Sequence, residues 1–407
     1  MNVIKYADNF VDHIQVNIDK NQEKSLSIEN NSIKSFQEKE TALYSIRVWK
    51  NNKEGFASGN KLNKELVKKA IKIAKLNANK EYFYGIPNLD KYKKINNFDK
   101  KLANIDESIL VDEARKIIKD IVKDNVILSS GAVQTNVSEN CILNSNGINI
   151  CEKSTEYGIG VSTVAKHKGK VCSWFDDKES NQFFTSSGWG QGVNEKTLFY
   201  LNAKKLSDKP KVVILNPEVF SELAKYSLLD NFNGKNVEKH KSLFCGKINE
   251  NIMKNISIHD NGLKGMQASS FDDEGTASKN TCIVDKGKLK NFIFDHNTAT
   301  HTKTKTTGNS SGGGIAFSNV YFNSDKNKIP NGLLIESIMG AHTGNSLTSD
   351  FSVQVEHAIY NGKPIKDFMI SGKMINVLNN VIGIDKNVQQ EQEIVIGNLA
   401  TDCINVI

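Results

Sequence analysis

The alternation of apolar and polar residues over the first sixty positions constrains the fold more than any other feature of this sequence. Residues 13–18, 25–29 and 42–50 each alternate with a period of two, which is typical of strands that bury one face. Residues 51–55 form a turn-like stretch that leads into residues 56–58. This order predicts an antiparallel meander in the first part of the chain.

Helical periodicity follows the meander. An apolar stripe predicts one helix from Asn63, and Asp106 is suited to cap the amino terminus of a second helix. A third helix is expected at about residues 193–206. The residues expected on the buried stripes are Leu66, Ala70, Ile73 and Asn77 in the first helix and Leu110, Ala114, Ile117 and Ile121 in the second.

Strand character returns between the second and third helices. Residues 127–138 and 140–151 are rich in strand formers, and Ser145-Asn146-Gly147 interrupts the second stretch as a hairpin signal. Residues 157–163 alternate again, and residues 171–175 can pair with them. Strands and helices without strict β–α alternation predict an α+β fold with antiparallel sheets.

Two domains are expected because 407 residues exceed the size at which a single core stops growing. We place the boundary near Pro210, which gives an amino-terminal α+β domain at residues 1–207 and a carboxy-terminal domain at residues 208–407. The second domain begins with a buried strand, and Pro217 opens a helix that continues to about Phe232. The short strands and Gly-rich turns that follow predict a mostly β, barrel-like domain.

Composition limits the class of protein and its partners. No run of residues approaches the ~18 apolar positions that span a bilayer, so no membrane contact is expected. The net charge is +7, but the lysines are interspersed with Asp, Glu and Asn, which argues against nucleic acid as a partner. The first eight residues lack the order of a secretory signal, and we expect a cytoplasmic protein.

The six cysteines include no Cys-x-x-Cys pair. We expect most of them to be small buried apolar groups, and disulfides to be absent in a reducing compartment. Cys141 and Cys151 flank the predicted hairpin, so metal or redox pairing between these two stays open as an alternative.

Three consecutive carboxylates, Asp272, Asp273 and Glu274, precede Gly275. Like charges this close raise one another's pKa and need backbone donors or a cation to hold them. One interpretation is a hydrogen-bonded turn that fixes the strand entering at Thr281, and the other is a groove that contacts peptide or a partner subunit. The glycine and the small polar residues that follow favour the turn.

A Gly-rich segment, residues 306–314, follows this turn and includes Thr307, Gly308 and Asn309. It matches neither of the common phosphate-binding glycine patterns, and we expect a mobile loop near a cleft. Farther along come Gly344-Asn345 and the stretch 348–352, which contains Asp350 and Ser352.

The acidic turn, Thr307-Gly308-Asn309, Gly344-Asn345 and residues 348–352 occur in an order that resembles the carboxy-terminal domain of the TldD/PmbA family, whose complexes are zinc peptidases. Catalytic members of that family hold zinc with His-Glu-x-x-x-His on the helix after the inter-domain strand. The matching helix here, residues 221–234, contains no His and only one Glu. The late Cys-Gly-Lys segment of the TldD type is also missing around Cys403. The resemblance is therefore to the PmbA (TldE) type.

This resemblance implies the non-catalytic subunit of a TldD–TldE complex that degrades or processes unstructured peptides. It implies no catalytic residue, metal or cofactor in this chain, with zinc on the TldD-type partner, while this chain shapes the chamber. The residues expected to line a groove or contact the partner are Asp272, Asp273, Glu274, Gly275, Thr307, Gly308, Asn309, Asp350 and Ser352.

Two alternatives remain at this stage. The chain could act alone as a homodimeric binding or scaffold protein without peptidase activity. It could instead be a hydrolase with an unrecognised metal site, for which His342 and His357, close in sequence to Asp350 and Glu356, are the best candidates.

Overall fold

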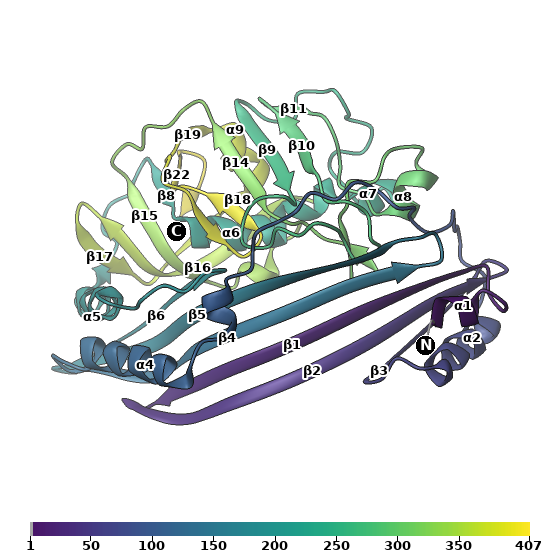
Figure 1. Ribbon diagram of the computed structural model, residues 1–407. Helices are drawn as coiled ribbons and strands as arrows, with labels where there is room; N and C mark the ends of the chain where they lie inside the picture. The colour runs from purple at the N-terminus through teal and green to yellow at the C-terminus, as the bar shows by residue number, and fades with distance from the viewer. Residues whose placement is uncertain (1–2) are drawn as a thin grey trace. The chain divides into compact units, whose positions relative to one another are not determined.

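The computed structural model describes residues 3–407 and divides into two compact units. One unit comprises Met1–Asp90 and Asn96–Asn202, and the other comprises Lys91–Ile95 and Ala203–Ile407. The sequence placed the boundary at residue 207, whereas the division falls at Asn202 and assigns a short upstream segment to the second unit. Figure 1 shows the elements of both units. No helix in the described part of the chain is long and apolar enough to cross a membrane.

One antiparallel sheet of long strands organises the first unit, with the strand order β3-β2-β1-β4-β5-β6. Asn30-Asn31 and Asn51-Asn52 form two-residue turns with positive φ at both positions, as the tightest hairpins require. The predicted meander and the predicted β4–β5 hairpin are confirmed. The strands are β1 (His13–Glu29), β2 (Ser32–Lys50), β3 (Lys53–Gly59), β4 (Val126–Asn144), β5 (Asn149–His167) and β6 (Lys170–Ser180).

Helices cover parts of this sheet: α1 (Val3–Ala7), α2 (Lys64–Leu76), α3 (Lys100–Ala103), α4 (Glu107–Ile121) and α5 (Trp189–Tyr200). Asp106 caps α4 through its side chain, as predicted, and Asn63, the predicted start of the first helix, caps α2 in the same way. The buried stripe of α2 differs from the prediction in two positions: Ile73 is exposed while Ala74 is buried, and Asn77 is exposed and forms the C-cap of the helix.

The third helix begins earlier than predicted. Two glycines in its first turn, Gly190 and Gly192, lower its helix propensity. Gly190 is buried between α5 and α4, where a Cβ atom would lie 2.9 Å from that of Asp120. Close packing of the two helices therefore overrides the local propensity, which the sequence pattern could not reveal.

The expectation of free cysteines is wrong for one pair. Cys141 and Cys151 form a disulfide across the β4–β5 hairpin. They lie directly opposite each other in the register, with Cα atoms 4.0 Å apart. Cys172, Cys245, Cys282 and Cys403 form no disulfide, and Cys172 is buried.

Two sheets surround one apolar core in the second unit. The first has the order β11-β10-β9-β14-β21-β20, and the second has the order β19-β22-β8-β15-β16-β17-β7, with β18 paired to β16 and β23 paired to β18. The strands are β7 (Lys204–Lys205), β8 (Val213–Leu215), β9 (Ile256–Asn261), β10 (Asn280–Asp285), β11 (Lys288–Leu289), β14 (Val320–Ser324), β15 (Leu333–Met339), β16 (Asp350–Tyr360), β17 (Lys363–Lys366), β18 (Phe368–Lys373), β19 (Val381–Ile384), β20 (Gln389–Glu391), β21 (Ile394–Ile396), β22 (Leu399–Thr401) and β23 (Asn405–Val406), and the separate pair is β12 (Ser310–Ser311) with β13 (Gly314–Ile315).

Helix α6 (Pro217–Ser227) contacts strands of both sheets. Its side chains Val219, Phe220, Leu223 and Ala224 are fully buried. The other helices of this unit are η1 (Leu229–Phe232), α7 (Gly234–Glu238), α8 (His296–His301), η2 (Ala341–Thr343) and α9 (Met374–Asn379). The predicted α+β fold with a mostly β carboxy-terminal half is thus confirmed.

Candidate functional site

Helix α6 is the first candidate site, because its position after a buried strand is where the zinc motif of the resembling family lies. Asn216 caps the helix by accepting a hydrogen bond from the backbone N–H of Val219 at 2.8 Å, and Pro217 occupies the first turn. A His-Glu-x-x-x-His motif needs two histidines and a glutamate, whereas α6 contains no His and has Glu218 and Glu222 as its acidic residues. The helix therefore lacks both histidine ligands of that motif.

The side chains of α6 do not fit a zinc site. Ser221 is buried, and its hydroxyl has no hydrogen-bond partner among the described residues. A serine hydroxyl and a tyrosine phenol are not the donors that zinc sites in proteins use. Burial raises the pKa of Glu222, and the charge of Glu356 on β16 raises it further. The carboxylates of Glu222 and Glu356 alone do not complete the tetrahedral ligand set of a zinc site.

No other metal centre is visible in the described chain. Across residues 3–407, no group of three or more His, Cys, Asp and Glu side chains is placed to hold an ion. His342 lies exposed in η2. His357 lies half-buried on β16, where it pairs with Ser337. The structure therefore offers no geometry for the metal hypothesis at these two histidines.

The acidic turn is the second candidate site, and Asp272 is its centre. One oxygen of Asp272 accepts hydrogen bonds from the backbone N–H groups of Glu274 at 3.0 Å and Thr276 at 2.9 Å. Its other oxygen accepts from the backbone N–H of Ser310 at 2.9 Å. Asp272 therefore closes its own turn and also holds the Gly-rich segment.

The two neighbouring carboxylates hold other parts of the chain. Asp273 accepts a hydrogen bond from the backbone N–H of Gly312 at 2.7 Å. Glu274 accepts from the backbone N–H of His296, the first residue of α8, at 2.9 Å. Each acidic residue thus satisfies the backbone of a different loop or helix end, which favours the architectural interpretation of this turn.

The Gly-rich segment is anchored from both sides. Thr307 accepts a hydrogen bond from the backbone N–H of Phe294 at 2.7 Å. Gly308 adopts φ +75° and packs so closely that a Cβ atom would lie 2.7 Å from the carbonyl oxygen of Ala277. The amide of Asn309 donates to the buried carboxylate of Asp260 at 2.6 Å. Only the tip, residues 311–313, is exposed.

Tyr92 contributes to this site, although no sequence pattern predicted a role for it. Its hydroxyl donates to the carbonyl oxygen of Gly275 at 2.8 Å, and its ring lies edge-on to Phe271 with centroids 6.2 Å apart. Tyr92 belongs to a lysine-rich run that has the composition of a solvated surface. A single aromatic residue among the lysines was the only available signal.

Asp350 and Ser352 lie apart from the acidic turn on the outer face of β16. Both side chains are exposed, since β16 alternates between exposed and buried positions from its first residue. Asp350 lies 3.4 Å from the ammonium of Lys373. A hydrogen bond from Thr348 and this lysine lower the pKa of Asp350. Asp350 and Ser352 therefore lie on an exposed strand face and not in the acidic turn.

The acidic turn makes stability depend on pH. Burial raises the pKa of Asp272 to about 7, despite its three N–H donors. A carboxyl with a higher pKa in the folded than in the unfolded chain binds more protons when folded. Its contribution to the free energy of unfolding should fall as pH rises from about 4, the pKa of an unperturbed Asp, to about 7. Thermal melts from about pH 4 to pH 7 should show the melting temperature of the wild type falling as pH rises. The Asp272→Asn variant should lack this fall. Equal pH dependence of the two proteins would contradict the prediction.

Comparison with known proteins agrees with this architecture along nearly the whole chain. Three domain models of one family match: PmbA/TldA metallopeptidase domain 1 at residues 16–78, the central domain at residues 98–209 and the C-terminal domain at residues 209–407. The division between central and C-terminal domains lies within a few residues of the boundary near Pro210.

Individual relatives cover similar lengths. An uncharacterized protein of Methanocaldococcus jannaschii is 28% identical, with 92% of each chain aligned. The metalloprotease PmbA of Escherichia coli O157:H7 is 21% identical over 97% of this chain and 92% of its own. The crystal structure of TldE from Thermococcus kodakarensis superposes with a TM-score of 0.92 at 23% identity, covering 100% of this chain and 99% of the other. The chain therefore belongs to the PmbA/TldD family, as a member of its PmbA (TldE) type.

Proposed function

We propose that this chain is the non-catalytic subunit of a TldD–TldE-type metallopeptidase complex that degrades or processes unstructured peptides. In this proposal the zinc and its general base lie on a TldD-type partner, and this chain closes the chamber around the peptide. We place the complex in the cytoplasm as part of the same proposal.

The observation that carries the proposal is the identity of the residues on α6. The helix follows a buried strand, as the zinc-binding helix of the family does, yet it contains no histidine. Peptide hydrolysis with zinc needs a cation that polarises the carbonyl and acidifies a water molecule. Because the residues on α6 cannot hold that cation, the chain would have to obtain this chemistry from another subunit.

Reconstitution tests the proposal. Mixing the chain with a zinc-bearing relative that carries His-Glu-x-x-x-His should give one stable complex on size-exclusion chromatography and a faster peptidase rate than the relative alone. An obligate interface of this kind is expected to bury more than about 2,000 Å². If the two proteins elute separately at micromolar concentration and the rate does not change, the subunit assignment is wrong. A stand-alone homodimeric binding protein would then be the better account.

A further inference from the structure

The outer edge of β2 is unpaired over most of its length. β3 pairs with β2 only from Tyr44 to Lys50. In the described part of the chain, no strand lies beside residues 32–43, and Figure 1 shows this bare edge of the sheet. The register between β1 and β2 is unbroken from Ser35 onward, and the segment contains no proline. A straight edge of this length can accept another strand.

The hairpin geometry shows which backbone groups face outward. Lys50 and Lys53 flank a two-residue turn, so they form a hydrogen-bonded pair between β2 and β3. Hydrogen-bonding direction alternates along a strand, and every second residue back from Lys50 therefore points away from β1. In the unpaired part, these residues are Phe36, Glu38, Glu40 and Ala42. Their N–H and C=O groups are available to an added strand.

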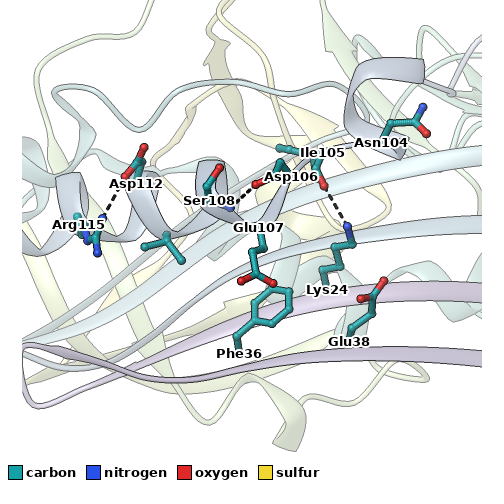
Figure 2. Close-up of a pocket in the computed structure, with 11 residues that line it drawn as sticks. Lys24, Phe36, Glu38, Asn104, Ile105, Asp106, Glu107, Ser108, Asp112 and Arg115 are labelled. Carbon is teal, nitrogen blue, oxygen red and sulfur yellow. Dashed lines mark hydrogen bonds and ion pairs between the residues drawn. The ribbon is translucent and has the colours of Figure 1, made fainter.

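The side chains of these residues lie on one face of the sheet, over two hollows. One hollow, of about 700 Å³, is lined by Phe36 and Glu38 together with the first turns of α4, and Figure 2 shows these two side chains on β2 facing that helix. The other, of about 440 Å³, is lined by Glu40 and Ala42 and by residues of β1, β4 and β5. Side chains of an added strand would have room on this face.

Charge decides what kind of strand fits. Glu38 and Glu40 are exposed on the hollow-lined face, and the carboxylate of Glu40 makes no hydrogen bond or ion pair with a described residue. Glu38 accepts one hydrogen bond, from Gln22 at 3.0 Å. Lys39 is exposed on the opposite face. The edge therefore presents an acidic, basic, acidic pattern.

A second copy of this chain does not fit that pattern. Antiparallel pairing of two β2 edges centred on residues 38 to 40 would place Glu38 or Glu40 opposite another glutamate. Like charges directly opposite each other destabilise a strand pair. A strand with lysine or arginine two residues apart, and an acidic residue between them, would instead meet an opposite charge at all three positions.

From these contacts we propose that residues 36–42 of β2 bind an extended basic peptide as an added antiparallel strand. The peptide carries Lys or Arg opposite Glu38 and Glu40 and an acidic residue opposite Lys39. Backbone hydrogen bonds supply the affinity, and the alternating charges supply the selectivity. This site would give the chain its own contact with unstructured peptides, and its test needs no partner subunit.

The probe is a fluorescein-labelled peptide, Val-Thr-Lys-Glu-Lys-Thr-Val, added to the full chain without any partner and followed by fluorescence anisotropy. We expect saturable binding of this peptide. The peptide in which Lys and Glu are exchanged should bind at least about tenfold more weakly. N-methylation of the two lysines should abolish binding, because their N–H groups face the β2 edge. N-methylation of the central Glu, whose N–H faces away, should leave binding intact.

The double variant Glu38→Lys/Glu40→Lys is the matched test on the protein, and both residues are exposed, so the fold should be kept. It should reverse the preference between the two peptides. Equal binding of both peptides, binding that survives lysine N-methylation, or no saturation up to about 1 mM would each overturn the proposal. Because the assay contains no zinc-bearing partner, any of these results leaves the subunit assignment untouched.

Discussion

Replacing Asp272 with alanine is expected to lower the free energy of unfolding by about 3 kcal/mol. The substitution removes the acceptor of three backbone N–H groups, those of Glu274, Thr276 and Ser310. Each buried donor left without a partner costs about 1–3 kcal/mol, and water entering the space recovers part of that cost. Denaturant unfolding followed by circular dichroism measures the change.

Asp350→Ala is the matched control, because it removes a carboxylate from the surface of the same unit. The Asp350 side chain is half exposed and pairs only with Lys373 and Thr348 among described groups. Surface ion pairs contribute about 0–1 kcal/mol, so little change is expected. If Asp272→Ala unfolds at the same denaturant concentration as Asp350→Ala, the acidic turn is not architectural. Binding to peptide or partner would then be its better explanation.

The second large effect is expected at Gly55, where β3 packs against α2. A Cβ atom on Gly55 would overlap the backbone carbonyl oxygen of Ala70 and lie within 2.8 Å of the Cβ of Ala74. Backbone atoms of a helix cannot move aside alone, so Gly55→Ala has to displace α2 from the core it shares with Ile46 and Val48. We expect a loss of about 3 kcal/mol or more, at the upper end of overpacking in cores.

Gly59→Ala provides the control on the same strand. There a Cβ atom would meet only Leu66 Cδ1, at 3.5 Å, which is an ordinary contact. Its effect on the free energy of unfolding should stay below about 1 kcal/mol. Equal effects of the two substitutions would show that the close approach of β3 and α2 is not maintained in solution.

Much of the fold could be predicted from local signals. Apolar alternation located the meander, the apolar stripe located the helix from Asn63, and the cap Asp106 located the next helix. Prediction failed where packing outweighs local preference, as at Gly190 in α5 and at Ile73, which faces solvent although it lies on the apolar stripe. The long middle of β1 and β2 was also underestimated, because neither face there is fully covered and the alternation weakens.

The site could be predicted only in part. The acidic turn was identified because three adjacent carboxylates are unusual, but their separate partners, such as Gly312 and His296, depend on the folded path of the chain. Tyr92 lies 183 residues from the carbonyl that it contacts, and no local pattern connects the two. The hairpin register places Cys141 directly opposite Cys151, and the two form a disulfide. The prediction that disulfides are absent in a reducing compartment did not take this register into account.

The central claim is that the catalytic residues of the assembled complex belong to the partner and not to this chain. Glu222 is the one glutamate of residues 221–234, the segment that matches the motif-bearing helix, which makes Glu222→Gln the most direct test. In a complex reconstituted with a zinc-bearing relative, the peptidase rate should be unchanged by Glu222→Gln. The same Glu-to-Gln change in the relative's His-Glu-x-x-x-His motif should abolish activity. Loss of activity with Glu222→Gln, in a complex that still assembles and binds zinc, would contradict the account.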